Sequence, residues 1–219
     1  MQITREEVIK KVLEEKVIAI VRGVDPDACV KVADALYAGG ICLMEITFNQ
    51  KDPSSFVNTA EAISRISEKY DGKMLVGAGT VTTPELVEMA VEAGAKYIIS
   101  PDTNVDVIRR TIELGAVSMP GALTPTEALT AHRAGADFVK IFPVGNLGAS
   151  YIKALCAPIS HVKFLGVGGV NEENAADFIK AGAVGLGIGG NLANKKWIDA
   201  GEFDKITDVA KKLVANLKA

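Results

Sequence analysis

A lysine inside an apolar segment is the residue whose position most strongly suggests chemistry. Lys140 stands in Phe-Val-Lys-Ile-Phe, late in a predicted strand over 138–142. Side chains alternate along a strand, so Lys140 faces opposite to Val139 and Ile141. Lysine is rarely buried without a function, and burial lowers the pKa of its amine. A neutral amine can attack a ketone and form a Schiff base. The alternative is a lysine that extends its ammonium group to water at a strand end.

Glu45 is the second candidate, and it could carry protons for the lysine. It stands in Leu-Met-Glu-Ile-Thr-Phe, where alternation puts Leu43, Glu45 and Thr47 on one face. A buried lysine would give this carboxylate a partner, and the carboxylate could then serve as acid and base. A purely structural ion pair is the alternative. Lys163 is a rival nucleophile in His-Val-Lys-Phe, but it lies nearer the start of its predicted strand.

Glycine-rich turns after the last two predicted strands indicate an anion site. Gly168 and Gly169 precede Asn171, an expected helix N-cap, and Gly189 and Gly190 follow the final strand. Backbone N–H groups in such turns can hold a phosphate. We therefore expect these four glycines to contact an anionic group of a small-molecule substrate.

The elements that must position these residues alternate between strands and helices. Ala-Gly pairs end several helical patterns, and Pro follows a capping residue at Asp25, Asp52, Thr83 and Thr124. Near-continuous apolar strands are typical of a parallel sheet covered by helices. The eight predicted strands are 17–21, 41–48, 74–76, 97–99, 116–119, 138–142, 162–165 and 184–188.

Eight such units predict an α/β protein with a single (β/α)₈ TIM barrel as its one domain, residues 1–219. An open doubly wound sheet is the competing fold, but no GxGxxG follows the first strand. Residues 4–16 predict an extra N-terminal helix closing the barrel's bottom, with Thr4 as N-cap and Glu7 completing a capping box. Active sites of barrels lie at the C-terminal ends of the strands. The further substrate-contact candidates at those ends are Arg22, Thr47, Thr80, Pro101, Pro120, Phe142 and Asn191.

Composition excludes several other classes of protein. The net charge is −3 and no basic run occurs, which argues against nucleic-acid binding. No apolar stretch is long enough to span a bilayer, and the N-terminus lacks the apolar core of a signal peptide, so we expect a cytoplasmic protein without a membrane partner. Three separated cysteines and two isolated histidines show no metal-ligand spacing, so no metal is expected.

In their order along the chain, these motifs resemble the KDPG/KHG aldolase family, the aldolases of 2-dehydro-3-deoxy-phosphogluconate and 4-hydroxy-2-oxoglutarate. The resemblance covers nearly the whole chain. It is carried by Gly-Gly-Ile with Met-Glu-Ile-Thr-Phe (39–48), Val-Gly-Ala-Gly-Thr-Val (76–81), Ile-Ser-Pro (99–101), Met-Pro-Gly-Ala-Leu-Thr-Pro-Thr-Glu (119–127), Phe-Val-Lys-Ile-Phe-Pro (138–143) and Gly-Gly-Val (168–170).

The resemblance implies a metal-independent class I aldolase without a cofactor, usually a homotrimer. Lys140 corresponds to the family's Schiff-base lysine and Glu45 to its acid/base. Thr80 corresponds to a threonine that helps to hold the pyruvyl carboxylate, and Arg22 to an arginine suited to an anionic end of the substrate.

Three positions depart from the better-known family pattern. Asn49 stands where many members have a carboxylate-binding arginine, Val167 replaces a threonine, and Asn191 replaces a serine. We therefore predict cleavage of 2-dehydro-3-deoxy-6-phosphogluconate, 4-hydroxy-2-oxoglutarate or both, with a reduced preference for phosphate. A phosphosugar isomerase or epimerase and a non-catalytic small-molecule sensor are the alternatives.

Overall fold

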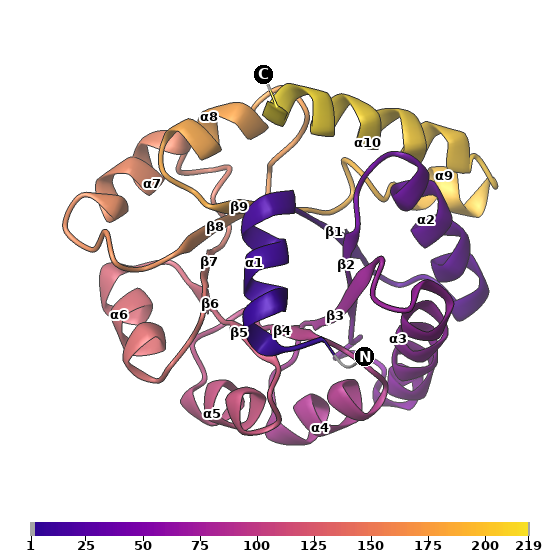
Figure 1. The fold of residues 1–219 in the computed structure, drawn as a ribbon, viewed down its shortest axis with the longest axis horizontal. Helices are drawn as coiled ribbons and strands as arrows, with labels where there is room; N and C mark the ends of the chain where they lie inside the picture. The colour runs from indigo at the N-terminus through magenta and orange to yellow at the C-terminus, as the bar shows by residue number, and fades with distance from the viewer. Residues whose placement is uncertain (1–2, 219) are drawn as a thin grey trace.

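Parallel strands form a nearly closed barrel surrounded by helices (Figure 1). The computed structural model describes residues 3–218. Neighbouring strands in the sheet follow the order β5-β4-β3-β2-β1-β9-β8-β7-β6. The strands are β1 (Val17–Val21), β2 (Leu43–Thr47), β3 (Leu75–Gly79), β4 (Tyr97–Ile99), β5 (Val117–Met119), β6 (Gly121–Ala122), β7 (Val139–Ile141), β8 (Phe164–Val167) and β9 (Gly185–Ile188).

Helices follow the strands around the outside of the barrel (Figure 1). No helix among the described residues is both long and apolar enough to cross a membrane. The helices are α1 (Arg5–Glu15), α2 (Pro26–Ala38), α3 (Phe56–Tyr70), α4 (Pro84–Glu92), α5 (Val105–Glu113), α6 (Pro125–Arg133), α7 (Ala149–Cys156), α8 (Ala175–Lys180), α9 (Lys195–Asp199) and α10 (Phe203–Lys218), with a short 3₁₀ helix η1 (Pro53–Ser55).

The predicted barrel is confirmed, but its fifth strand is split in two. Pro120 separates β5 from β6, because proline has no N–H to donate to a sheet. Its carbonyl still accepts a hydrogen bond from the Lys140 N–H at 2.8 Å, and the Ser118 carbonyl accepts one from the Phe138 N–H at 3.2 Å. These bonds join the two ends of the sheet order and close the barrel.

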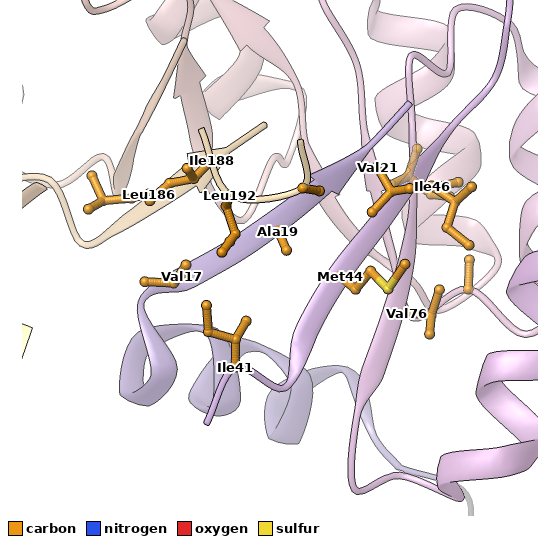
Figure 2. Close-up of a cluster of buried hydrophobic side chains, with 14 of the residues drawn as sticks. Val17, Ala19, Val21, Ile41, Met44, Ile46, Val76, Leu186, Ile188 and Leu192 are labelled. Atoms are coloured by element: carbon orange, nitrogen blue, oxygen red, sulfur yellow. The ribbon is translucent and has the colours of Figure 1, made fainter. Parts of the chain in front are cut away.

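Alternation along the strands separates two apolar cores. Val17, Ala19 and Val21 of β1 pack outward with Met44 and Ile46 of β2, as Figure 2 shows. The intervening side chains fill the barrel interior, including Ile18, Leu43, Leu75, Tyr97 and Leu165. Glu45 occupies the same face of β2 as Leu43, so the strand that packs the core also aims a carboxylate inward.

Helix α1 crosses the N-terminal end of the barrel, as predicted (Figure 1). Thr4 and Glu7 form the expected capping box. Val8 and Val12 pack into the interior core. Arg5 grips the Asp137 carboxylate with two hydrogen bonds of 2.7 and 3.2 Å, which fixes the helix to the chain just before β7.

The helix starts agree with the sequence at three of the four Pro-preceding caps, Asp25, Thr83 and Thr124. The prediction at Asp52 holds in part: Asp52 is the N-cap position of η1 and Pro53 its first residue, but the Asp52 carboxylate accepts from the Ser54 hydroxyl and from no backbone N–H of the helix, and α3 begins only at Phe56. The N-cap predicted at Asn171 is confirmed in its hydrogen bonds but not in its position. The Asn171 side chain accepts from the N–H groups of Glu173 and Asn174, but these residues form a turn, and the N-cap position of α8 is Asn174.

Candidate active site

A cavity of about 580 Å³ opens at the C-terminal ends of the strands. It collects side chains and loops from β1, β2, β3, β4, β7, β8 and β9, which are far apart in sequence. Most of the predicted site residues line it together: Arg22, Glu45, Thr80, Pro101, Lys140, Phe142, Gly168, Gly169, Gly189, Gly190 and Asn191.

Lys140 is the central residue of β7 and is only 7% exposed. Its Nζ lies 4.9 Å from the centroid of the Phe142 ring. Burial lowers the pKa of the Lys140 amine, and the positive charge of Arg22 lowers it further, while Glu45 raises it. The net shift is downward, so the strand holds an amine with an increased fraction of the neutral, nucleophilic form.

Glu45 is the central residue of β2 and is 2% exposed. Burial raises the pKa of its carboxyl, and the nearby charges of Lys140 and Arg22 oppose that rise. Its Oε2 atom has no hydrogen-bond partner among the described residues. An unpaired buried carboxyl group costs stability and is typical of a group reserved for a ligand or a proton.

Gly79 makes room for the Glu45 side chain. A Cβ atom at position 79 would lie 2.5 Å from Glu45 Oε1, closer than any real contact. This role of Gly79 was not predicted from the sequence, although Gly-Ala-Gly at the end of an apolar strand was a signal of close packing.

Thr80 follows β3 with a backbone φ of +56°. A non-glycine residue in this left-handed region is strained by about 1–3 kcal/mol, and such residues concentrate at functional sites. The Thr80 carbonyl accepts a hydrogen bond from the Gln50 side chain at 2.9 Å, which holds the loops after β2 and β3 together.

The glycine-rich loops after β8 and β9 form one wall of the cavity. Gly168 and Gly169 have φ values of +88° and +80°, and a Cβ at position 169 would lie 2.9 Å from Gly145 Cα. The Asn191 amide donates to the Val170 carbonyl at 3.0 Å and joins the two loops. In the part of the chain that the structure describes, the N–H groups of Gly169, Val170 and Gly190 donate to no protein acceptor. These donors remain available to an anion.

Comparison with known proteins agrees with this geometry. The model of the family described as KDPG and KHG aldolase matches residues 8–209. The chain is 40% identical to 2-dehydro-3-deoxy-6-phosphogalactonate aldolase of Escherichia coli (strain K12), over 80% of this chain and 83% of that protein. It is 31% identical to the KHG/KDPG aldolase of the same strain, over 86% of each chain. A solved structure named "Native KDPGal structure" superposes with a TM-score of 0.83 at 35% identity, covering 92% of this chain and 94% of that one.

The chain belongs to the KDPG/KHG aldolase family. The resemblance drawn from the sequence is confirmed, and the aldolase interpretation is favoured over the isomerase and sensor alternatives. Members of the family are carbon–carbon lyases, so the cavity is the place to look for aldol cleavage.

Two residues predicted to contact substrate lie outside this aldolase cavity. Pro120 is buried between β5 and β6, where its carbonyl supports the backbone of β7. Thr47 lines a separate cavity of about 240 Å³ with Asn49, Ser55 and Thr59. Its hydroxyl is buried without a partner among the described residues, and its Cγ2 and Glu45 Oε1 both lie within 3 Å of where a Cβ on Gly79 would be, so contact of Thr47 with the substrate stays a prediction.

The structure separates the two candidate lysines. Lys163 directly precedes β8 at the opposite end of that strand from the cavity, and its side chain is exposed. Its Nζ lies 5.9 Å from the centroid of the Phe138 ring, in the N-terminal half of the barrel. The sequence left two candidate nucleophiles, and of these two lysines only Lys140 lines the cavity.

Several cavity residues were not predicted from the sequence. Ile20, Val170 and Ala193 contribute apolar surface, and Lys195 contributes a cation at the start of α9. Lys195 is five residues beyond Gly190, and nothing in the local sequence distinguishes it from a surface lysine. Among residues 3–218, His, Cys, Asp and Glu side chains form no group of three that could hold a metal ion.

Proposed function

We propose that this aldolase cleaves a phosphorylated 4-hydroxy-2-oxo acid to pyruvate and a phosphorylated aldehyde through a Schiff base on Lys140. The observation that carries the proposal is the juxtaposition, inside one cavity, of a buried amine with a lowered pKa and a buried carboxyl group with a raised pKa. No hydrogen bond or ion pair links Lys140 with Glu45 in the described structure. Both groups are therefore free to react with a substrate placed between them.

The first half of the reaction builds an electron acceptor on the lysine. The neutral Lys140 Nζ attacks the C2 carbonyl carbon, and the carbonyl oxygen becomes the hydroxyl of a carbinolamine after proton transfer from nitrogen. Protonated Glu45 then gives its proton to that hydroxyl, which leaves as water. The nitrogen lone pair forms the C=N bond, giving an iminium ion beside the Glu45 carboxylate.

The second half breaks the carbon–carbon bond. The Glu45 carboxylate, directly or through a water, takes the proton of the C4 hydroxyl. The C4–O bond becomes a carbonyl as the C3–C4 bond breaks, and its electron pair moves into the iminium to form a neutral enamine. Glu45 returns the proton to C3, and water adds to the resulting iminium. Loss of the amine from the adduct releases pyruvate and neutral Lys140, and the proton set free returns to the Glu45 carboxylate.

The substrate-binding roles follow from the position of each group around this pair. Arg22 and the loop of Thr80 lie at the ends of β1 and β3 and would bind the carboxylate of the pyruvyl unit. Free N–H groups in the loops after β8 and β9 would bind the phosphate. The relative with 40% identity is named for 2-dehydro-3-deoxy-6-phosphogalactonate, so we propose this compound and its gluconate epimer as substrates.

4-Hydroxy-2-oxoglutarate is the second substrate candidate. Val167 lines the cavity without a hydroxyl, and the Asn191 amide is engaged with the Val170 carbonyl. Loss of a hydrogen bond to a charged group costs about 1.5–3 kcal/mol. We therefore expect a smaller preference for phosphate than a chain with threonine and serine at these two positions would have.

The proposal includes one folded domain, a homotrimer and a cytoplasmic location. Family membership supports the trimer, and three cysteines without a disulfide fit a reducing compartment. The iminium supplies the electron acceptor, so neither metal nor cofactor is needed. Activity that survives EDTA and a sedimentation mass of three chains would agree with these parts.

Steady-state assays with each candidate substrate test the proposal directly. Purified enzyme is assayed with both phosphorylated epimers and with 4-hydroxy-2-oxoglutarate, and pyruvate release is followed. We expect kcat/KM to be highest for a phosphorylated six-carbon acid. In a Val167→Thr, Asn191→Ser double variant, the ratio of phosphorylated to unphosphorylated kcat/KM should rise. An unchanged ratio would remove these two positions from phosphate recognition, and absence of pyruvate release from every substrate would reject the function.

A further inference from the structure

Lys195 is a cation at the rim of the cavity, and its ion pair with Asp199 contributes little to stability. It begins α9, lines the same cavity as Lys140, and its Nζ lies 2.7 Å from Asp199 Oδ1 one turn along that helix. The two side chains are 60% and 59% exposed. Exposed ion pairs four residues apart on a helix contribute little stability. Another anion can therefore take the place of Asp199 at small cost.

The segment that carries Lys195 is anchored firmly. Leu192 is fully buried among the outward side chains of β1 and β9 (Figure 2). Ile198 on α9 is buried as well, and Asn194 caps the helix by accepting from the Lys196 N–H at 3.0 Å. A fixed backbone with a long, exposed side chain lets the ammonium group move without moving the loop.

The surroundings of Lys195 favour an anion with several acceptor oxygens. The free N–H group of Gly190 belongs to the same loop, and those of Gly169 and Val170 lie across the Asn191 bridge. Glu45 is the acidic side chain lining the cavity, and it lies deep inside on β2. An ammonium group at the rim completes a donor set for a terminal phosphate group.

We propose that Lys195 determines the preference for phosphorylated substrates, by exchanging Asp199 for the terminal phosphate of the substrate. This inference rests on the proposed function and deepens it. A phosphate dianion attracts the ammonium more strongly than a carboxylate does, whereas an uncharged substrate end leaves the Lys195–Asp199 pair intact. The positive charge of Lys195 thus replaces the hydroxyl groups that threonine and serine would provide at positions 167 and 191.

The condensation direction gives the sharpest test, because the acceptor aldehyde can be varied while pyruvate stays the same. Initial rates are measured with glyceraldehyde 3-phosphate and with glyceraldehyde, in wild type, Lys195→Ala, Lys195→Arg and Asp199→Asn. Lys196→Ala is the matched control, since this neighbouring lysine does not line the cavity. Borohydride trapping of the pyruvate adduct is run on every variant.

Lys195→Ala should raise KM for glyceraldehyde 3-phosphate about tenfold, the lower end expected for a hydrogen bond to a charged group. Its KM for glyceraldehyde and its kcat should stay within about twofold of wild type. Lys195→Arg should restore most of the preference. Asp199→Asn should lower KM for the phosphorylated aldehyde, because the competing carboxylate is gone.

Three outcomes would overturn the assignment: equal KM changes for both aldehydes, a Lys195→Ala effect no larger than that of Lys196→Ala, or no effect at all. Normal trapping of pyruvate in these variants would show that the Schiff-base function stands and that only the role of Lys195 fails. Absence of trapping in wild type would instead reject the proposed function.

Discussion

Two carboxyl groups at opposite ends of this barrel, one half-buried and one buried, differ in their hydrogen bonding. At the N-terminal end, Asp137 receives two hydrogen bonds from Arg5 and a third from the Ser118 N–H at 2.9 Å. At the C-terminal end, Glu45 is more deeply buried, and its Oε2 has no partner among the described residues. Asp137 has its hydrogen-bond partners within the protein, whereas Glu45 Oε2 is available to a bound substrate.

The N-terminal ends of the strands contribute to folding stability, whereas their C-terminal ends carry the residues proposed for catalysis. Helix α1 covers the N-terminal end with Val8, Val12 and Arg5, so that end gains packing and a partly buried ion pair. The C-terminal end has a cavity, a strained Thr80 and unpaired N–H groups. The comparison predicts that changes at the first end alter unfolding and changes at the second end alter turnover.

The largest expected effect comes from the two lysines. Lys140→Ala should reduce kcat by about 10⁴-fold or more, because loss of a covalent nucleophile removes the pathway itself. Lys163→Ala is the control, and it should retain nearly full activity because that side chain is exposed outside the cavity. Steady-state pyruvate release measures both. Comparable losses of kcat in the two variants would contradict the assignment of catalysis to the C-terminal end of the barrel.

Glu45→Gln should lower kcat by about 10²–10⁴-fold, the usual contribution of a positioned acid or base. The amide fits the same space and leaves the fold intact, which circular dichroism would check. Single-turnover kinetics should show that imine formation and cleavage are both slowed. If only KM changed, Glu45 would be a binding residue and the proton-transfer role would be lost.

Asp137→Ala should lower the free energy of unfolding by about 1.5–3 kcal/mol, as expected when hydrogen bonds to a charged group are lost. Turnover at low temperature should stay close to wild type. Asp27→Ala is the matched control, since its ion pair with Arg65 at 2.7 Å is exposed and should matter little. Urea unfolding of the three proteins measures the difference. A fall in kcat for folded Asp137→Ala would contradict the separation.

The smallest expected effect is a gain in stability when the buried amine is removed. The pKa of Lys140 lies below its usual value of 10.5, so just below that pH the unfolded chain binds a proton that the folded chain lacks. Stability should therefore fall as pH falls through that window. Glu45→Gln with Lys140→Met should unfold at higher urea than Glu45→Gln alone, and its advantage should grow from about pH 10 toward pH 7. A constant advantage would mean that the pKa is not shifted.

The sequence predicted best those features for which a residue type at its position has a single physical explanation. A lysine and a glutamate alternating with apolar neighbours indicated an inward direction, and both were found in the cavity. The capping box of α1 was equally readable, because it depends on residues three positions apart.

Features that depend on long-range packing were not predictable from local pattern. The closure of the barrel by hydrogen bonds from Phe138 and Lys140 to Ser118 and Pro120 depends on how the two ends of the sheet meet. Thr47 has the same alternation as Glu45, but it lines a second cavity beside η1, and the local pattern does not distinguish the two cavities. Lys195 was missed because a surface lysine after a loop has no distinguishing local signal, and only the curvature of the barrel brings it to the same cavity as Lys140.

The central claim is that Lys140 forms the covalent intermediate. Enzyme incubated with pyruvate and sodium borohydride, digested and examined by mass spectrometry, should carry one reduced pyruvyl group on the peptide containing Lys140. The mass should be absent without pyruvate and in Lys140→Ala. A reduced adduct on Lys163 or Lys195, or full activity with no adduct at all, would contradict the account.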